Sequence, residues 1–277
     1  MSSMQAKLWV VATPLGNLGD FSPRAAEILQ GAGLILAEDT RRAGLLFQRL
    51  GLTHGRMVSS FDHNESSRIG LVLSTLEQGE HVALISDAGT PLIADPGFPL
   101  VRACRDAGFA VSPVPGPCAP IAALMASGLP TTPFTFLGFM PRKGSDIRAT
   151  LEPFARLKTT LVFFERKNRL PQSLRVAFET LGPRNYCVAR ELTKTHEEFI
   201  FGLLPLDQDA DLDSLLGECT VLIAPGEEPA RSNEVDVVRM IQEEHLRGGR
   251  PRDVAKRVCA RVAGWTVKDV YALLQRI

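Results

Sequence analysis

Three short apolar runs in the first 120 residues each lead into a turn rich in glycine and proline. The runs are Leu8–Val11, Val82–Ile85 and Val111–Val114, and they have the length and composition of buried strands. Amphipathic stretches with helical periodicity separate the runs, for example Asn64–Gln78. Because strands that alternate with helices pair in parallel, the first half of the chain is constrained to an α/β fold.

The three turns read ATPLGNLGD, SDAGTPLIADPG and PGPCAP. In an open α/β sheet, ligands bind outside the carboxyl ends of the strands, so three such turns predict one shared crevice. Glycine lets the backbone approach a ligand closely and proline fixes the shape of a turn, which suits a small polar ligand. The alternative is that glycine and proline only punctuate the strands.

Two changes in composition divide the chain. The turn GLPTTP ends the alternating half, and PGEEPARSN reads as a polar linker. We expect an N-terminal α/β domain over residues 1–128, a second α/β domain over residues 129–226 and a basic helical domain over residues 233–277. Consecutive strand-like runs without an intervening helix, late in the second part, predict a mixed sheet there.

The charge of the whole chain gives no sign of a nucleic-acid partner, because 31 basic residues balance 31 acidic ones. Such a partner must therefore meet a local patch. The five cysteines are widely spaced and form no CxxC pair, so we expect reduced thiols and a cytoplasmic protein. No His, Cys, Asp or Glu spacing predicts a metal site. The start MSSMQAK does not read as a signal peptide, and no apolar run approaches the roughly 18 residues of a membrane span.

Two common nucleotide-binding loops are excluded. The pattern GxxxxGK[ST] is missing, and the pair Gly31 and Gly33 lacks a third glycine and precedes a strand. The remaining interpretations of the turns are an adenine-type ligand held by proline-containing loops, or no ligand at all.

Further segments accompany the turns along the chain, namely LAEDTRR, FDHNE, FLGFMPRKG, FFER and ARELTKTHEEF. Together with VATPLGNLGD, LISDAGTPLIADPG and VPGPCAPIAAL, they resemble, in order, the tetrapyrrole-methylase-like family. Within it they are similar to the branch that methylates the 2′-oxygen of a cytidine in small-subunit ribosomal RNA. The resemblance covers nearly the whole chain. It implies two α/β domains with the cofactor S-adenosyl-L-methionine in the cleft between them, in a homodimer.

The resemblance also implies which residues hold the cofactor. They are Pro14 and Leu15 in the first turn, Asp87, Gly89, Thr90 and Ile93 in the second, Cys118 and Ala119 in the third, and Phe164 and Ala189 at strand ends of the second domain. Core packing is the alternative for Leu15, Ile93 and Phe164. Asp87 could hold the ammonium group of the cofactor or lie near its sulfonium, and an Asx-turn is the alternative.

Methyl transfer to a ribose hydroxyl is an in-line displacement, so orientation of the reacting atoms should supply most of the catalysis. A general base could add about 10²–10⁴-fold. The candidates for that base are Glu38, Asp39, His63, Glu191 and Lys194. Asp39 can equally cap the helix that follows it, and Lys194 can contact a phosphate instead.

Basic residues near the turns and in the tail are the candidate RNA contacts, namely Arg41, Arg42, Arg142, Lys143, Arg166, Arg252, Lys256 and Arg257. From Arg247 to Ile277 eight basic residues stand against two acidic ones, an excess that suits phosphate binding, although a solvated helix face is the alternative. The segment ERKNR at residues 165–169 departs from the branch, which has a small residue after the glutamate and a histidine before the arginine. This departure bears on a detail of substrate contact.

Two rival functions stay open. The chain could be a methyltransferase of the same fold acting on a tetrapyrrole or a modified protein side chain, or a non-catalytic RNA-binding factor in ribosome assembly. The basic tail and the segment EDTRR favour RNA as the substrate. The resemblance implies that this RNA is ribosomal RNA, within the small subunit. Cofactor titration followed by a methyl-transfer assay separates an enzyme from an assembly factor.

Overall fold

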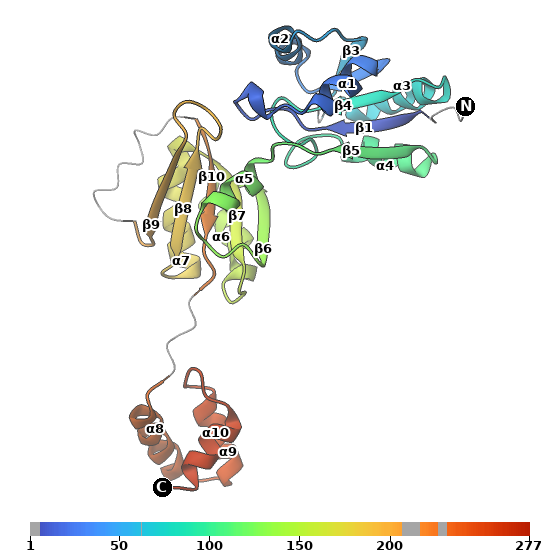
Figure 1. The fold of residues 1–277 in the computed structure, drawn as a ribbon. Coiled ribbons are helices and arrows are strands. Elements are labelled where there is room, and N and C mark those ends of the chain that lie inside the picture. Colours follow the sequence, from blue (N-terminus) through green and yellow to red (C-terminus); the bar gives the residue numbers. More distant parts are fainter. Residues whose placement is uncertain (1–5, 62, 207–216, 227–231) are drawn as a thin grey trace. The chain divides into compact units, whose positions relative to one another are not determined.

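The computed structural model describes residues 6–61, 63–206, 217–226 and 232–277. Two compact units make up the chain, Met1–Pro225 and Gly226–Ile277. The first contains two five-stranded sheets with their helices, and the second is helical (Figure 1). The expected α/β class with a C-terminal helical domain is therefore confirmed.

The first sheet is parallel throughout, with the strand order β3-β2-β4-β1-β5. Its strands are β1 (Lys7–Val11), β2 (Leu34–Ala37), β3 (Arg56–Ser59), β4 (Val82–Ile85) and β5 (Ala110–Val114). The connections contain α1 (Pro23–Gly31), α2 (Thr40–Leu50), α3 (Glu65–Glu77), α4 (Phe98–Asp106) and the short 3-10 helix η1 (Leu18–Asp20). All four residues of β2 and of β4 are buried, as expected for strands whose two faces are both covered by helices.

One apolar cluster lies on each face of this sheet. The helices α1 and α2 contribute Leu29 and Phe47 to the first cluster, and α3 and α4 contribute Leu76 and Leu100 to the second. Local signals fix both ends of α2. At its start, the Asp39 side chain accepts a hydrogen bond from the Arg41 backbone N–H, and directly after its last residue the C-cap Gly51 has a φ of 64°. These short-range patterns explain why the strand–helix alternation could be predicted.

The second sheet is mixed, with the strand order β6-β7-β10-β8-β9. Its strands are β6 (Phe134–Phe139), β7 (Thr160–Arg166), β8 (Asn185–Arg190), β9 (Glu198–Leu203) and β10 (Glu218–Ile223). Only the pair of β6 and β7 is parallel among the strand pairs described. The helices α6 (Gly144–Leu151) and α7 (Leu170–Leu181) share an apolar cluster with one face of the sheet, beside the short 3-10 helices η2 (Glu152–Phe154) and η3 (Lys167–Arg169).

The opposite face of the second sheet packs against α5 (Ala119–Ala126). Ala123 and Leu124 of this helix share an apolar cluster with Val162 of β7 and Cys187 of β8. The sequence-based division at residue 128 assigns α5 to the first domain, although its buried side belongs to the core of the second sheet. The division into domains at residues 128 and 129 stays a prediction.

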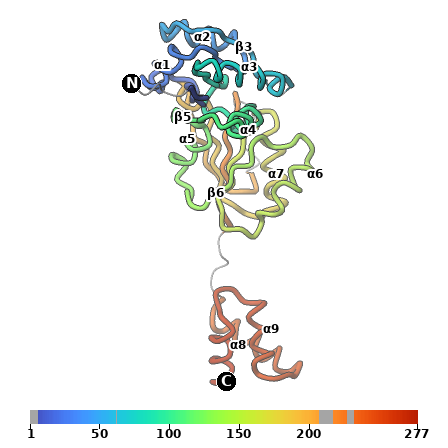
Figure 2. The backbone as a smooth tube through the Cα atoms, turned by 90° about the vertical axis from the view of Figure 1, so that its right-hand side faces the viewer, coloured from blue at the N-terminus to red at the C-terminus, as the bar shows by residue number. Residues whose placement is uncertain are grey.

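The described residues of the C-terminal unit form the helices α8 (Glu234–Leu246), α9 (Pro251–Cys259) and α10 (Val267–Leu274), which share a small apolar core. Figure 2 traces the backbone of this unit, with α8 and α9 labelled. Thr266 and Asp269 form a capping box at the start of α10. None of the helices in the described parts of the chain has the length and apolarity that a membrane crossing requires.

A buried carboxylate organises the charges of the C-terminal unit. The Glu244 side chain is 2% exposed and accepts charged hydrogen bonds from Arg247 at 2.7 Å, Arg257 at 2.8 Å and Arg261 at 2.9 Å. The hydrogen bond from Arg257 is the main cause that lowers the pKa of Glu244. Three of the eight basic side chains in the tail are thus engaged inside their own unit.

Candidate functional site

The strand order brings the three turns together. β1 lies between β4 and β5, so the turns that follow these strands leave the same edge of the sheet side by side. Thr13 and Gly89 exchange backbone hydrogen bonds of 2.8 and 3.1 Å, and the Ala12 N–H donates to the carbonyl of Val114 at 3.2 Å. The turns therefore form one hydrogen-bonded rim, as the sequence predicts for a shared crevice.

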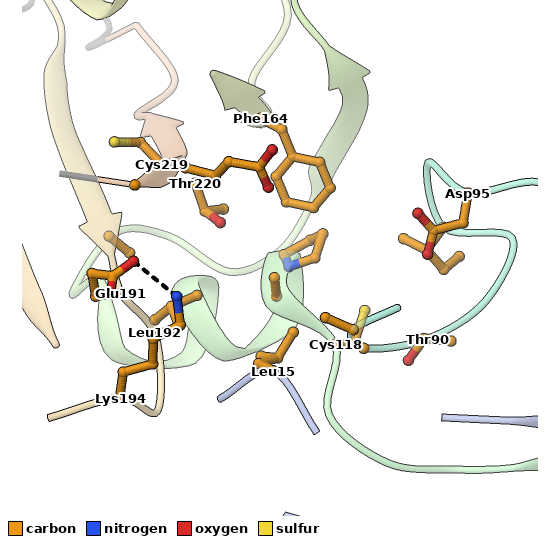
Figure 3. A pocket seen from close by; sticks show the side chains of 18 of the residues that line it. Leu15, Thr90, Asp95, Cys118, Phe164, Glu191, Leu192, Lys194, Cys219 and Thr220 are labelled. Carbon is orange, nitrogen blue, oxygen red and sulfur yellow. Dashed lines mark hydrogen bonds and ion pairs between the residues drawn. The ribbon is translucent and has the colours of Figure 1, made fainter. Parts of the chain in front are cut away.

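A cavity of about 450 Å³ opens beside this rim and is closed on its other side by the second sheet (Figure 3). Both sheets belong to the first compact unit. The lining comes from turns and strand ends in both halves of that unit. Its members are Leu15, Arg42, Ala88, Gly89, Thr90, Ile93, Asp95, Cys118, Ala119, Pro120, Phe139, Phe164, Ala189, Glu191, Leu192, Lys194, Gly217, Glu218, Cys219 and Thr220.

One row of paired residues crosses the second sheet and forms part of the cavity wall. Phe139 of β6 pairs with Phe164 of β7, which pairs with Thr220 of β10, which in turn pairs with Ala189 of β8. All four line the cavity. Strand pairing therefore places two aromatic rings and two small side chains along one line of the wall.

The rim supplies backbone groups rather than bulky side chains. Gly89 has a φ of +82°, which favours glycine, and a Cβ at this position would lie 3.0 Å from Leu15 Cδ2. The Thr90 hydroxyl donates to the carbonyl of Pro117 at 2.9 Å and so ties the second turn to the third. Cys118 precedes α5 without a side-chain cap, and the Ala119 N–H at the start of this helix lies at the cavity, whereas the next residue, Pro120, has no N–H.

Eight of the ten expected cofactor residues line the cavity: Leu15, Gly89, Thr90, Ile93, Cys118, Ala119, Phe164 and Ala189. Pro14 is buried outside the lining. Asp87 is also outside the lining, and its carboxylate accepts hydrogen bonds from the Asp39 N–H and from Arg42, each at 3.0 Å. Asp87 thus connects the turn after β4 to the start of α2 and anchors Arg42, which does line the cavity. The cofactor roles of these residues stay predictions.

The five candidates for a general base separate clearly in the structure. Glu191 and Lys194 line the cavity and form an ion pair of 2.9 Å (Figure 3), whereas Glu38, Asp39 and His63 are outside the lining. Asp39 caps α2 and pairs with Arg41 at 2.7 Å, which holds the pKa of the Asp39 carboxyl well below its usual range. Geometry therefore favours Glu191 and Lys194 for chemistry in the cavity.

The segment that carries this ion pair also contacts the first turn. The Asn17 N–H donates to the Thr193 hydroxyl at 3.1 Å. A Cβ on Gly16 would overlap Lys194 Cγ, so the aliphatic part of Lys194 packs directly on the glycine. The first turn and the segment after β8 therefore hold each other in place beside the cavity.

The expected RNA contacts lie in several places. Arg42 lines the cavity, while Arg41, Arg142, Lys143 and Arg166 are exposed side chains of the first unit. In the C-terminal unit Arg252 and Lys256 are exposed, whereas Arg257 is engaged by Glu244 and by the carbonyl of Gly248. Their RNA-binding roles stay predictions. No group of His, Cys, Asp and Glu side chains suited to a metal ion occurs among the residues that the structure describes.

Several lining residues were not singled out from the sequence, and Asp95 is the most distinctive of them. Burial raises its pKa from 3.8 to about 6, against the opposing effect of a hydrogen bond with Ser86. The negative charges of Glu38, Asp87 and Glu218 raise it further. Asp95 belongs to the turn SDAGTPLIADPG, so its position in that turn was the available signal, whereas Glu218 and Thr220 of β10 had none.

We expect Asp95→Asn to stabilise the chain at pH 8. The pKa of Asp95 is higher in the folded chain than in the unfolded chain. Its contribution to the free energy of unfolding is therefore complete below about pH 4 and is lost as the pH rises through about 6. The full pKa change corresponds to roughly 3 kcal/mol, and solvent screening of this half-buried group reduces the expected gain to about 1–2 kcal/mol. Urea unfolding of both proteins at pH 5 and pH 8 measures the difference. Equal stabilities at pH 8 would show that Asp95 ionises without cost.

Comparisons with known proteins show the family of the chain. Residues 7–207 match the family Tetrapyrrole (Corrin/Porphyrin) Methylases. Proteins named Ribosomal RNA small subunit methyltransferase I are 39% identical in Pasteurella multocida (98% of this chain, 97% of the relative) and 42% identical in Mycobacterium bovis (97% and 95%). The relative of that name in Escherichia coli O157:H7 is 49% identical over 70% of this chain and 68% of its own.

Solved structures show the same fold at low identity. The methyltransferase CobJ matches with a TM-score of 0.62 and 20% identity, over 82% of this chain and 97% of its own. Uroporphyrin-III C-methyl transferase from Thermus thermophilus, complexed with S-adenyl homocysteine, matches with a TM-score of 0.54 and 20% identity over 78% and 97%. The family match and the near full-length relatives show that the chain belongs to the tetrapyrrole methylase family, within the branch whose members are named ribosomal RNA small subunit methyltransferase I.

Proposed function

We propose that this chain transfers the methyl group of S-adenosylmethionine to the 2′-oxygen of a cytidine ribose in small-subunit ribosomal RNA. The observation that carries the proposal is convergence: segments typical of this branch, distributed from the first turn to the segment after β8, line one cavity. The near full-length relatives, named for small-subunit ribosomal RNA, support the same substrate.

The cavity fits the cofactor in size and in chemistry. Its volume of about 450 Å³ lies within the range of roughly 300–1,000 Å³ that is usual for small-molecule sites. Gly89 leaves space where a Cβ would press on Leu15, and the Ala119 N–H at the start of α5 suits an anionic or polar group. Asp95, Glu191 and Glu218 line the same space and suit a cationic ligand.

When bound, S-adenosylmethionine supplies a methyl group on a positively charged sulfur. The backbone of Gly89, Thr90 and Ala119 would bind its polar ends, and Phe164 and Ala189 would face its adenosine. These residues are contributed by turns and strands that are hydrogen-bonded to one another, so they orient the cofactor with little reorganisation.

Methylation of a hydroxyl releases its proton. Of the five candidate residues, Glu191 and Lys194 are the two whose side chains line the cavity. We assign the proton acceptor to this pair, in which the Lys194 ammonium holds the Glu191 carboxylate in place at 2.9 Å. Arg42 at the same cavity, together with the exposed Arg41, would then meet the phosphates beside the target ribose.

The rival functions are less well supported. The solved methyltransferases of tetrapyrrole synthesis share the fold at about 20% identity, which shows no common substrate, whereas the relatives at 39–42% identity are named for ribosomal RNA. A binding factor without catalysis would not need a cavity with a lysine–glutamate pair. We also propose that the enzyme works as a homodimer in the cytoplasm on the assembled small subunit, and its five free cysteines agree with a reducing compartment.

The direct test is methyl transfer from labelled S-adenosylmethionine to isolated small ribosomal subunits that lack the modification. Naked ribosomal RNA and large subunits serve as comparison substrates. Labelling of the small subunit alone supports the proposal, and equal labelling of naked small-subunit RNA would replace the assembled subunit by free RNA as the substrate.

A further inference from the structure

The edge strand of the second sheet presents an aromatic ring at the mouth of the cavity. Phe139, the last residue of β6, lines the cavity and is nevertheless 49% exposed. β6 is one of the two edge strands of the sheet, so Phe139 lies at one end of the paired row that continues through Phe164. An aromatic ring that lines a cavity and is half in solvent leaves one face accessible to a ligand.

A β-bulge directs Phe139 onto this face. Between the pairs Phe136–Val162 and Phe139–Phe164, β6 advances three residues while β7 advances two. Without the extra residue, the alternation of side chains would turn Phe139 toward the α6 and α7 face. Gly138, with a φ of +69°, provides the left-handed backbone at this point. Bulges that re-aim a side chain are common beside functional sites.

Aromatic neighbours support the ring from behind. The centroid of Phe139 lies 5.1 Å from that of Phe164, and Phe164 in turn lies 5.2 Å from Phe136 in an edge-on contact. Phe136 and Phe164 are half-buried, whereas Phe139 keeps half of its surface free. The cluster therefore offers one aromatic surface that is held in place and open to a ligand.

A buried ion pair fixes the chain directly after Phe139. Arg169 donates to the carbonyls of Met140 at 2.7 Å and Pro141 at 3.0 Å. Arg169 is paired at 2.8 Å with Glu165, which is 1% exposed and also accepts hydrogen bonds from the Ser173 hydroxyl and from a backbone N–H. These contacts hold the segment in one conformation, so little entropy is lost when it binds a partner.

Two exposed cations follow the ring within four residues. Arg142 and Lys143 are exposed and precede α6. An aromatic platform beside cations is the combination by which proteins bind single-stranded nucleic acids, with bases stacked on rings and phosphates at the cations. The bound cofactor would bury most of its surface deeper in the cavity, where Phe164 and Ala189 lie.

We propose that Phe139 is the stacking platform for a nucleobase of the RNA substrate, held by the bulge at Gly138 and by the Glu165–Arg169 pair, with Arg142 and Lys143 on the adjoining phosphates. The inference rests on the proposed function and adds the residue that selects an unpaired nucleotide. Because stacking needs only an aromatic face, tyrosine at position 139 preserves it and leucine or alanine does not.

The test compares Phe139→Ala, Phe139→Leu and Phe139→Tyr with Phe134→Ala as the matched control. Phe134 begins the same strand, is 40% exposed and lies outside the cavity lining. The KM for small ribosomal subunits is measured in the methyl-transfer assay, and S-adenosylmethionine affinity is measured by calorimetry. We expect Phe139→Ala and Phe139→Leu to raise the subunit KM by about 5- to 100-fold, with cofactor affinity within twofold of the parent. Phe139→Tyr and Phe134→Ala should remain within about threefold.

Three results would overturn parts of this account separately. Loss of cofactor affinity equal to the loss of RNA affinity would assign Phe139 to the adenine of the cofactor. An unchanged subunit KM in Phe139→Ala, with an active parent enzyme, would overturn the platform alone. A parent enzyme that methylates no RNA would overturn the proposed function and the platform together.

Discussion

Ala189→Phe is expected to lower the affinity for S-adenosylmethionine by at least about 100-fold while the chain stays folded. Ala189 is 1% exposed, yet its side chain lines the cavity between Thr220 on one neighbouring strand and Phe199 on the other. A phenyl ring at this position would extend into the cavity and occupy the region assigned to the adenosine. A 100-fold loss corresponds to about 2.7 kcal/mol of binding free energy.

Calorimetric titration measures this loss, and circular dichroism checks the fold. Ala126→Phe is the matched control, because Ala126 is an exposed residue at the end of α5 outside the lining. Overpacking costs about 1–3 kcal/mol of stability, so Ala189→Phe should melt at a lower temperature and still unfold cooperatively. Full cofactor affinity in a folded Ala189→Phe protein would move the cofactor away from this cavity.

Removal of the C-terminal unit is expected to weaken RNA binding far more than cofactor binding. Five of the eight basic side chains remain for RNA once the three held by Glu244 are set aside, namely Arg250, Arg252, Lys256, Lys268 and Arg276. Each phosphate neutralised on a single strand contributes about 0.7 to the log–log salt dependence of affinity. Deletion of residues 233–277 should therefore reduce that slope by at most roughly 3.5.

A second variant separates charge from fold. Replacing the five free cations by glutamine leaves Glu244 and its three arginines in place, so the helical unit should keep its structure. RNA binding of both variants is measured across a salt series, with cofactor titrations alongside. If the glutamine variant shows the same log–log salt dependence of RNA affinity as the full chain, the tail is a structural or dimer-packing element. The RNA path would then involve Arg41, Arg42, Arg142, Lys143, Arg166 and Lys194 alone.

The sequence predicted those features of the fold that depend on local patterns. The buried strand VALI and the cap at Asp39 are each encoded within a few residues. The order β3-β2-β4-β1-β5 depends on pairing between distant segments, and no local signal carries it. The packing of α5 on the second sheet was missed for the same reason, since its turn belongs to the first sheet and its apolar side to the second.

The sequence predicted that three turns meet at one crevice, whereas the individual cofactor residues in them were implied by the family resemblance. Leu15, Thr90 and Cys118 lie in turns that must meet at one sheet edge. Asp87 lies in the second of these turns, but its carboxylate accepts hydrogen bonds from Arg42 and from the Asp39 backbone. The spacing of residues in the sequence cannot show this side-chain direction. Phe139 was missed because only the bulge in β6 brings it onto the cavity face.

The raised pKa of Asp95 could not be anticipated either. The shift comes mainly from burial, and then from the acidic groups of Glu38, Asp87 and Glu218, which three different segments bring together. A sequence shows that an aspartate is present, whereas the cost of ionising it depends on what the fold places around it.

The central claim is that this cavity serves methyl transfer to a ribose hydroxyl of ribosomal RNA. Its most direct test incubates the purified chain with isotopically labelled S-adenosylmethionine and small ribosomal subunits that lack the modification, digests the RNA to nucleosides and identifies the labelled nucleoside by mass spectrometry. We predict label in 2′-O-methylcytidine of small-subunit RNA, and none with Ala189→Phe. Label in a methylated base, or no labelled nucleoside from a chain that binds the cofactor, would contradict the account.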